Sequence, residues 1–226
     1  MSRYVLSTTE KIILLLVVLI VITGFVLFYT SLPSFEWYIR EDSLVEWMTV
    51  LGLLLGSFIC LARFIQLFRA RNWWFLTVTL LLGVLLFFAA GEEISWGQRL
   101  FGIESSEYFQ KNNAQGETNL HNLVYDGVKI NKLIFTLGLG IALGIYLLVL
   151  PILHANSVAF KKMIDKSGVP VAKLYQLISF ALIAGITVLL PHGKNPELLE
   201  AGAVLLFFLV IRFPKNLYIF NKSSGL

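Results

Sequence analysis

Residues 73–93 read WWFLTVTLLLGVLLFFAAGEE, an uncharged apolar run that ends in two adjacent glutamates. About 20 such residues are enough for a helix to cross the roughly 30 Å hydrocarbon core of a bilayer. The paired tryptophans at the start suit the membrane–water interface, where aromatic side chains gather. The run therefore predicts a transmembrane helix that carries Glu92 and Glu93 to the far side of the membrane.

Similar apolar runs recur along the chain of 226 residues, which is 57% hydrophobic and only 14% charged. A mean hydropathy of +0.78 is typical of polytopic membrane proteins. The runs are long and lack strict alternation, which favours helices over strands. We predict a single all-α domain over residues 1–226, a polytopic helical membrane bundle of about six transmembrane helices. The predicted spans are residues 12–30, 45–66, 73–91, 132–153, 173–191 and 197–213. The first span could also be a cleaved signal peptide, although its apolar run is longer than the usual one.

The orientation of the bundle follows from its basic residues. Twelve of the eighteen lysines and arginines fall on the side of the two termini, which the positive-inside rule assigns to the cytoplasm. Twelve of the fourteen carboxylates fall on the opposite, extracytoplasmic side. We therefore predict a multi-pass protein of the plasma or inner membrane with both termini cytoplasmic. Anionic lipid is a sufficient partner for the basic face, so no nucleic-acid partner is predicted.

Single residues inside the spans constrain packing and redox chemistry. The GxxxG pairs Gly52/Gly56 and Gly140/Gly144 predict close helix packing within the monomer. The single cysteine, Cys60, lies in the middle of a span, so an intramolecular disulfide and a CxxC metal site are both excluded.

The most polar part of the chain is Gly91–Asn122, which reads GEEISWGQRLFG, then a short linker, then QGETNLHN. Ionisable groups next to a membrane are costly unless they are used. If the helix continued past Gly91, then Glu92, Trp96 and Arg99 would share one of its faces.

The segment 92–131 is too long for a tight turn, which predicts an interfacial loop with structure or function of its own. Ser105 or Ser106 would cap a short interfacial helix there. The GETNLHN sequence predicts a second helix, on which Glu117 and His121 are i,i+4 partners. This spacing suits two metal ligands, a carboxylate that orients an imidazole, or simply a solvated helix face.

Glu200 is the second unusual carboxylate. Eleven residues separate it from Arg212, about 17 Å of helix, so a span anchored by Arg212 leaves Glu200 below the outer interface. A carboxylate at this depth is expected to face the bundle and to have a partner. His192, which follows Pro191 at the outer end of the fifth span, is the predicted partner.

These residues allow two kinds of chemistry, and their spacing does not separate them. A His/carboxylate site could bind a divalent metal such as zinc or iron. Its candidate ligands are His121, His192, Glu93, Glu117 and Glu200. Without metal, Glu92 or Glu93 could activate water while His121 and His192 hold the oxyanion. The planar fork of Arg99 suits an anionic head group or phosphate. The other candidate substrate contacts are Trp96, Gln98, Asn119 and Asn122.

GEEISWGQR followed by GETNLHN resembles a signature of uncharacterised polytopic membrane proteins, which implies relatives but no activity. The block also has a weaker, chemical likeness to the CAAX-protease/bacteriocin-processing (Abi) membrane proteases, with their EExxxR, FxxxH and HxxxN motifs. In that family a glutamate activates water, and two histidines with an asparagine hold the oxyanion. Here Arg99 follows Glu93 after five residues instead of three, and Glu117 stands where that family has phenylalanine. His192 and Asn195 are one residue too close for the third motif.

We therefore expect a multi-pass membrane enzyme, a hydrolase or transferase, whose extracytoplasmic site acts on a lipid or lipid-linked substrate. The competing expectation is a small transporter or membrane assembly subunit that binds a cation or proton at the same residues. Polar residues inside the spans are few, which favours a one-sided site over a conduit.

Overall fold

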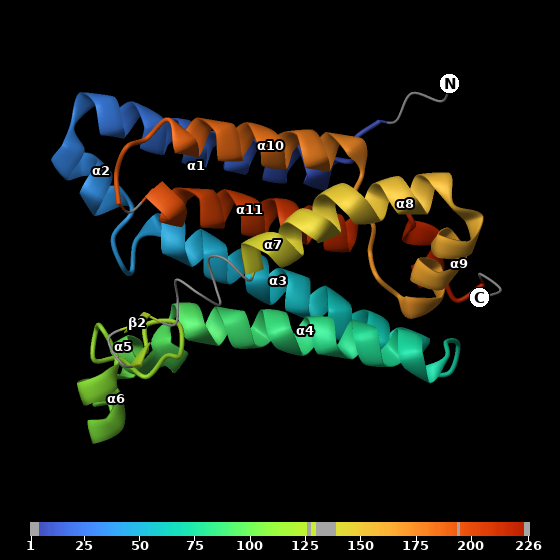
Figure 1. Ribbon diagram of the computed structural model, residues 1–226, viewed down its shortest axis with the longest axis horizontal. Helices are drawn as coiled ribbons and strands as arrows, with labels where there is room; N and C mark the ends of the chain where they lie inside the picture. Colours follow the sequence, from blue (N-terminus) through green and yellow to red (C-terminus); the bar gives the residue numbers. More distant parts are fainter. Residues whose placement is uncertain (1–4, 126–127, 130–138, 194, 224–226) are drawn as a thin grey trace.

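The computed structural model describes residues 5–125, 128–129, 139–193 and 195–223. Three of its helices are long and apolar enough to cross a membrane, which suggests a membrane protein (Figure 1). They are α1 (Thr8–Thr30), α3 (Leu44–Leu67) and α4 (Trp73–Glu93). These helices coincide with the first three predicted spans to within a few residues.

The other three predicted spans correspond to shorter or interrupted helices. They are α10 (Leu174–Val188), α11 (Asn195–Arg212), and the consecutive turns α7 (Leu139–Gly144), η3 (Ile145–Val149) and α8 (Leu150–Asn156). The middle turns, η3, form a π-helix. The fourth predicted span starts outside the described residues. The count of six spans therefore stays a prediction.

Short elements complete the fold. They are α2 (Leu32–Tyr38), η1 (Ser95–Gly97), α5 (Gln98–Phe101), α6 (Glu107–Asn112), β1 (Val124–Tyr125), β2 (Val128–Lys129), α9 (Val158–Ser167) and η4 (Leu217–Phe220). The two short strands pair antiparallel, and elsewhere the described chain is helix and loop. The α6 helix lies where a short interfacial helix was expected. Ser106 is its N-cap residue, although its side chain makes no capping hydrogen bond.

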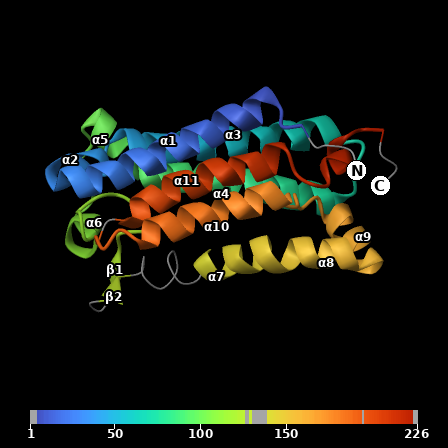
Figure 2. The same cartoon turned by 90° about the horizontal axis from the view of Figure 1, so that it is seen from above.

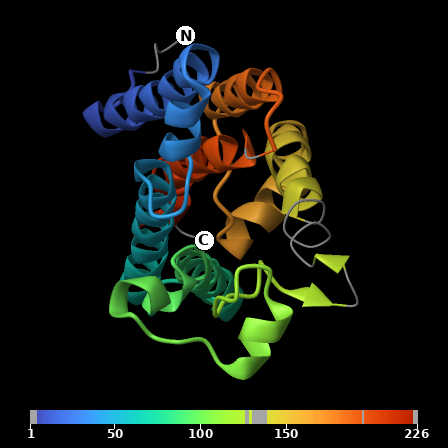
Figure 3. The ribbon, with the colours of Figure 1, turned by 90° about the vertical axis from the view of Figure 1, so that its left-hand side faces the viewer.

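Helix α11 forms the centre of the bundle, with α1, α3 and α10 around it (Figure 3). Its residues Leu205, Leu206 and Leu209 are at most 1% exposed. Glycine lets α3 approach it closely, because a Cβ added at Gly52 would lie 2.8 Å from Val204 Cγ1. Gly56 is similarly close to Ile211 and Leu86, so this GxxxG pair packs within the monomer as predicted.

Both ends of the described chain lie at one end of the bundle, and the polar block lies at the other (Figures 1 and 2). Two arginines from α3 and from the loop that follows it have structural roles at the end of the bundle where the chain ends lie. Arg63 donates to the carbonyl oxygens of Ile211 (2.6 Å) and Arg212 (3.3 Å) at the end of α11. Arg71 donates in the same way to the carbonyl of Ile219 (2.9 Å). These cations satisfy carbonyls that a helix terminus leaves open.

Candidate functional site

Helix α4 ends at Glu93, and a turn with a rare backbone geometry follows it. Ser95, Trp96 and Gly97 have φ angles of 47°, 55° and 78°, a region that residues other than glycine seldom adopt. The helix therefore does not continue through Arg99, and the condition under which Glu92, Trp96 and Arg99 would share a helix face is not met. Trp96 folds back over α4, and its ring would lie 2.9 Å from a Cβ at Gly91. The chain changes direction at this turn, and the Arg99 side chain points toward Glu117 and Glu46.

Glu92 holds the loop that carries His121. Its Oε1 accepts from Trp96 Nε1 (2.9 Å), and its Oε2 accepts from the backbone N–H groups of Leu120 (2.5 Å) and His121 (3.2 Å). The residue is only 4% exposed. Because both oxygens already have partners, Glu92 serves to position the loop, and Glu93 is the freer of the two glutamates.

Arg99 is the hub of the block. Its Nη1 donates to both carboxylate oxygens of Glu117 (3.0 and 2.9 Å), and its Nη2 donates to Glu46 Oε1 (2.6 Å). Its Nε donates to Asp42 Oδ1 (3.3 Å). Burial by itself lowers the pKa of Arg99, but the hydrogen bonds that Arg99 donates to Glu117 and the charges of the nearby carboxylates raise this pKa above its ordinary value. The predicted contact between Arg99 and a phosphate stays a prediction, and a phosphate would have to compete with these carboxylates.

The GETNLHN segment is an irregular loop, so the expected helical pairing of Glu117 with His121 is wrong. The reason is that its side chains bind other partners. Glu117 accepts from Arg99 and from Ser95 Oγ, and the buried Asn119 donates to Ser95 Oγ (2.9 Å). These hydrogen bonds connect the loop to the turn after α4. The loop is therefore ordered without the i→i−4 backbone hydrogen bonds of a helix.

The predicted amides Gln98 and Asn122 also serve the loop. Gln98 Oε1 accepts from the backbone N–H of Thr118 (2.7 Å), and Gln98 Nε2 donates to Ser105 Oγ (2.6 Å). The backbone N–H of Asn122 donates to Asn119 Oδ1 (3.1 Å), and its side-chain amide donates to Gln115. Of these two amides, only Asn122 reaches the cavity described next.

A cavity of about 130 Å³ lies against this loop. Five glutamates and two arginines supply its charged lining, together with His121 and three amides. The charged and amide residues are Arg40, Glu41, Glu46, Glu93, Arg99, Gln115, Glu117, Asn119, Asn122 and Glu197. Carboxylates outnumber guanidinium groups here, so the cavity is acidic even though Arg99 neutralises part of its wall.

Glu93 joins this cavity to helix α11. Its carboxyl group lies close enough to that of Glu200 for the two to interact electrostatically. Two carboxyl groups at such close range repel one another when both are ionised, which favours a state with one proton on the pair. Glu200 was expected to pair with His192, and the structure pairs it with Glu93 instead. Glu93 is half-buried, and Glu200 is exposed at the surface of the bundle.

The two outer histidines lie in different surroundings. His121 lines the cavity, and burial lowers its pKa below the ordinary value, so it is neutral at pH 7. His192 lies against α2, with Nε2 3.6 Å from Glu36 Oε1 and its ring 5.2 Å from that of Phe35. His192 is not among the residues that line the cavity. Within the described ranges, no group of three or more His, Cys, Asp or Glu side chains is arranged to hold a metal ion.

Several residues at this end of the bundle have roles that their sequence pattern does not indicate. Ser95, Asp42 and Glu46 contact Arg99 or Glu117, and Glu197 lines the cavity. Glu197 had been explained as a helix-terminus residue only. The one available signal was the concentration of carboxylates on the predicted outer side, because contacts across 20 to more than 50 residues leave no local pattern.

Comparison with protein-family models, with curated proteins and with solved structures gives no match for this chain.

Proposed function

We propose that this protein is a membrane enzyme, a hydrolase or transferase, that acts on a lipid or lipid-linked substrate at the extracytoplasmic face. The observation that carries the proposal is the Glu93–Glu200 pair, two neighbouring carboxyl groups beside an acidic cavity, which we take to share one proton. The proposed topology has six spans and both termini in the cytoplasm. It is supported by the position of both chain ends opposite the polar block.

A pair of this kind can act as base and acid in one reaction, as carboxyl dyads do in aspartic proteases. The ionised carboxylate takes a proton from water, whose oxygen attacks the electrophilic carbon of the substrate. The protonated carboxyl gives its proton to the leaving oxygen as the old bond breaks. The pair then again holds one proton, while water has supplied H to one product and OH to the other. In a transferase, a substrate hydroxyl takes the place of water.

His121 and the amides would serve the substrate. A neutral imidazole can donate one hydrogen bond to a developing oxyanion, and the low pKa of His121 keeps it in that state. Asn122 lies in the same cavity wall and offers a second donor. Arg99 would act through the carboxylates that it orients.

The experiment compares Glu93→Gln and Glu200→Gln with the wild-type protein. Either amide can still hydrogen-bond the remaining carboxylate, so the fold should be retained while the shared proton is lost. Purified protein is placed in vesicles of total membrane lipid in H₂¹⁸O, and mass spectrometry follows ¹⁸O in released products. We expect a fall of about 10²–10⁴-fold in both variants.

The matched control is Glu107→Gln on α6, which changes an exposed glutamate outside the cavity and should retain full activity. Unchanged turnover in both dyad variants would overturn the proposal. Transfer without water would give new lipid products that lack ¹⁸O.

A second candidate function is cation or proton binding by a transporter or assembly subunit. The excess of carboxylates over guanidinium groups in the cavity favours it. In that case wild-type protein should form no product in the assay. It should instead show an uptake or release of protons that Glu93→Gln and Glu200→Gln abolish.

A further inference from the structure

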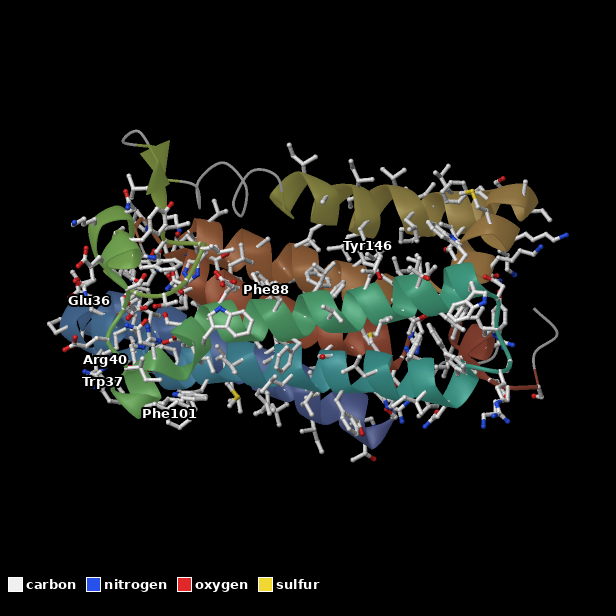
Figure 4. The ribbon with its side chains drawn as sticks, turned by 90° about the horizontal axis from the view of Figure 1, so that it is seen from below. Glu36, Trp37, Arg40, Phe88, Phe101 and Tyr146 are labelled. Atoms are coloured by element: carbon white, nitrogen blue, oxygen red, sulfur yellow. The ribbon has the colours of Figure 1, made fainter. Side chains whose placement is uncertain are left out.

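A groove of about 380 Å³ lies at the end of the bundle where the chain ends meet, between the end of α3 and the tail after α11. Figure 4 places Glu36 and Arg40 at the other end, beside the polar block. The groove volume falls within the roughly 300–1,000 Å³ of small-molecule sites, so it has room for more than a single ion. Six described residues line this groove, which we call the tail groove: Phe64, Ile65, Gln66, Phe68, Arg69 and Lys222. None of these six is a carboxylate.

The chain builds the tail groove by holding its tail against the turn between α3 and α4. Arg71 lies in this turn, and its Nη2 donates to the carbonyl oxygens of Ile219 (2.9 Å) and Asn221 (2.6 Å). These hydrogen bonds fix the backbone on both sides of the groove. They bring Lys222 into the same groove as Arg69, although the two residues are far apart in the sequence. Each wall therefore contributes one cation.

The carboxylates at this end of the bundle do not compensate these two cations. Among the described residues they are Glu10 and Asp165, which are 1% and 3% exposed. Glu10 accepts from Lys173 Nζ (3.2 Å), and Asp165 lies 3.0 Å from His154 Nε2. Both carboxylates are thus buried with partners inside the bundle. Like charges that share one groove repel each other, and an anion from outside would relieve this repulsion.

Aromatic side chains place the tail groove at the level of lipid head groups. Trp73 and Trp74 begin α4 and are 72% and 65% exposed, as is typical of the membrane–water interface. The ring of Phe68, in the groove, has its centroid 5.8 Å from that of Trp73. Ile65 precedes Arg69 along α3, so it lies deeper in the bundle, and it is 73% exposed. The groove therefore has cations at head-group level and an apolar wall on its hydrocarbon side.

We propose that the tail groove binds one anionic phospholipid, with its phosphate between Arg69 and Lys222 and an acyl chain along Phe64 and Ile65. The planar fork of an arginine suits a phosphate, and basic pockets at helix ends recognise anionic head groups. A free phosphate would leave the apolar wall uncovered, so the lining selects a lipid. The site is independent of the proposed reaction, because it lies at the opposite end of the bundle from Glu93.

The test counts bound lipid on the full chain by native mass spectrometry. Protein in detergent is mixed with phosphatidylglycerol or with phosphatidylcholine of the same chain length. We expect one phosphatidylglycerol molecule to remain on the wild-type protein, with a preference over phosphatidylcholine of roughly 25-fold. Arg69→Gln and Lys222→Gln should each reduce this preference about five-fold, and the double variant should abolish it. Both side chains are exposed, so the variants should fold.

The matched control is Lys162→Gln, which removes an exposed cation of α9 outside the tail groove and should leave binding unchanged. Arg69→Lys keeps the charge and should lose less binding than Arg69→Gln. Equal binding of the two lipids, or a loss in Lys162→Gln as large as in Arg69→Gln, would overturn the site.

A second arm separates a lipid from a free anion. Excess inorganic phosphate should leave the bound phosphatidylglycerol in place, because it cannot replace the contacts of the acyl chain. Displacement of the lipid by phosphate would overturn the lipid site and assign the groove to a free anion.

Discussion

The two ends of the bundle each contain one ionised hub, and the hubs are built in opposite ways. At the end with the polar block, which we call the outer end after the proposed topology, the cation Arg99 is surrounded by carboxylates. At the opposite end, which we call the inner end, the anion Asp165 is surrounded by groups that need no charge. Its Oδ1 lies 3.0 Å from both His154 Nε2 and Asn216 Nδ2, and Tyr218 donates its hydroxyl to Oδ2.

The two hubs differ in how completely their charged groups are used. Asp165 is 3% exposed, and its partners come from α8 and from the tail after α11, so the hub fastens the chain end to the bundle. Burial raises its pKa, but the hydrogen bonds from Tyr218, Asn216 and His154 outweigh this and lower it. The Arg99 hub lies beside a cavity. Some acidic groups there form no ion pair with Arg99, among them the carboxyl groups of Glu93 and Glu200.

The largest expected effect is on the inner hub. Asp165→Ala leaves the donors of His154, Asn216 and Tyr218 without their acceptor, and we expect a loss of about 3–5 kcal/mol of stability. Thermal unfolding in detergent measures this. Asp165→Asn keeps one acceptor oxygen and should lose less. If Asp165→Ala melts like the wild type, the inner hub does not fasten the tail.

A smaller effect is expected for Arg99→Ala. Without the guanidinium, Glu46, Glu117 and Asp42 repel one another, which should cost about 1–3 kcal/mol at pH 7. Protonation then relieves the repulsion, so this variant should gain stability when the pH is lowered from 7 to 5. Unfolding scans at both pH values check the sign. A variant that loses stability on acidification would contradict the role of Arg99 as counter-charge.

The smallest effect concerns His121. Burial lowers the pKa of His121 in the folded protein. In the unfolded chain this histidine has its ordinary pKa of about 6.5, so the unfolded chain binds a proton at a higher pH than the folded protein does. Its contribution to stability is therefore complete above that pH and falls as the pH drops toward the folded-state pKa. In His121→Asn the free energy of unfolding should change less between pH 7 and pH 5 than in the wild type, and we expect this difference to be below about 1 kcal/mol. His192→Asn, outside the cavity, is the matched control, and an equal change in both variants would argue against a buried His121.

The separation of the two ends was predictable from charge counting along the chain. Apolar runs located α1, α3 and α4 because the cost of burying polar groups in a bilayer acts on every residue of a span. The same reasoning identified the polar block and both glutamates of the proposed pair. It paired Glu200 with the wrong residue, since His192 is eight positions away in sequence but packs against α2.

The sequence by itself determined that the protein has long apolar helices, that its acidic residues collect at one end, and that Glu93, His121 and Glu200 belong to that end. These properties follow from local composition. Only the tertiary structure decided that α4 stops at a left-handed turn, that Glu92 anchors a loop, and that Glu93 meets Glu200. Each of these depends on contacts between segments far apart in the chain, whose geometry is set by packing around α11 and leaves no periodic trace in the sequence.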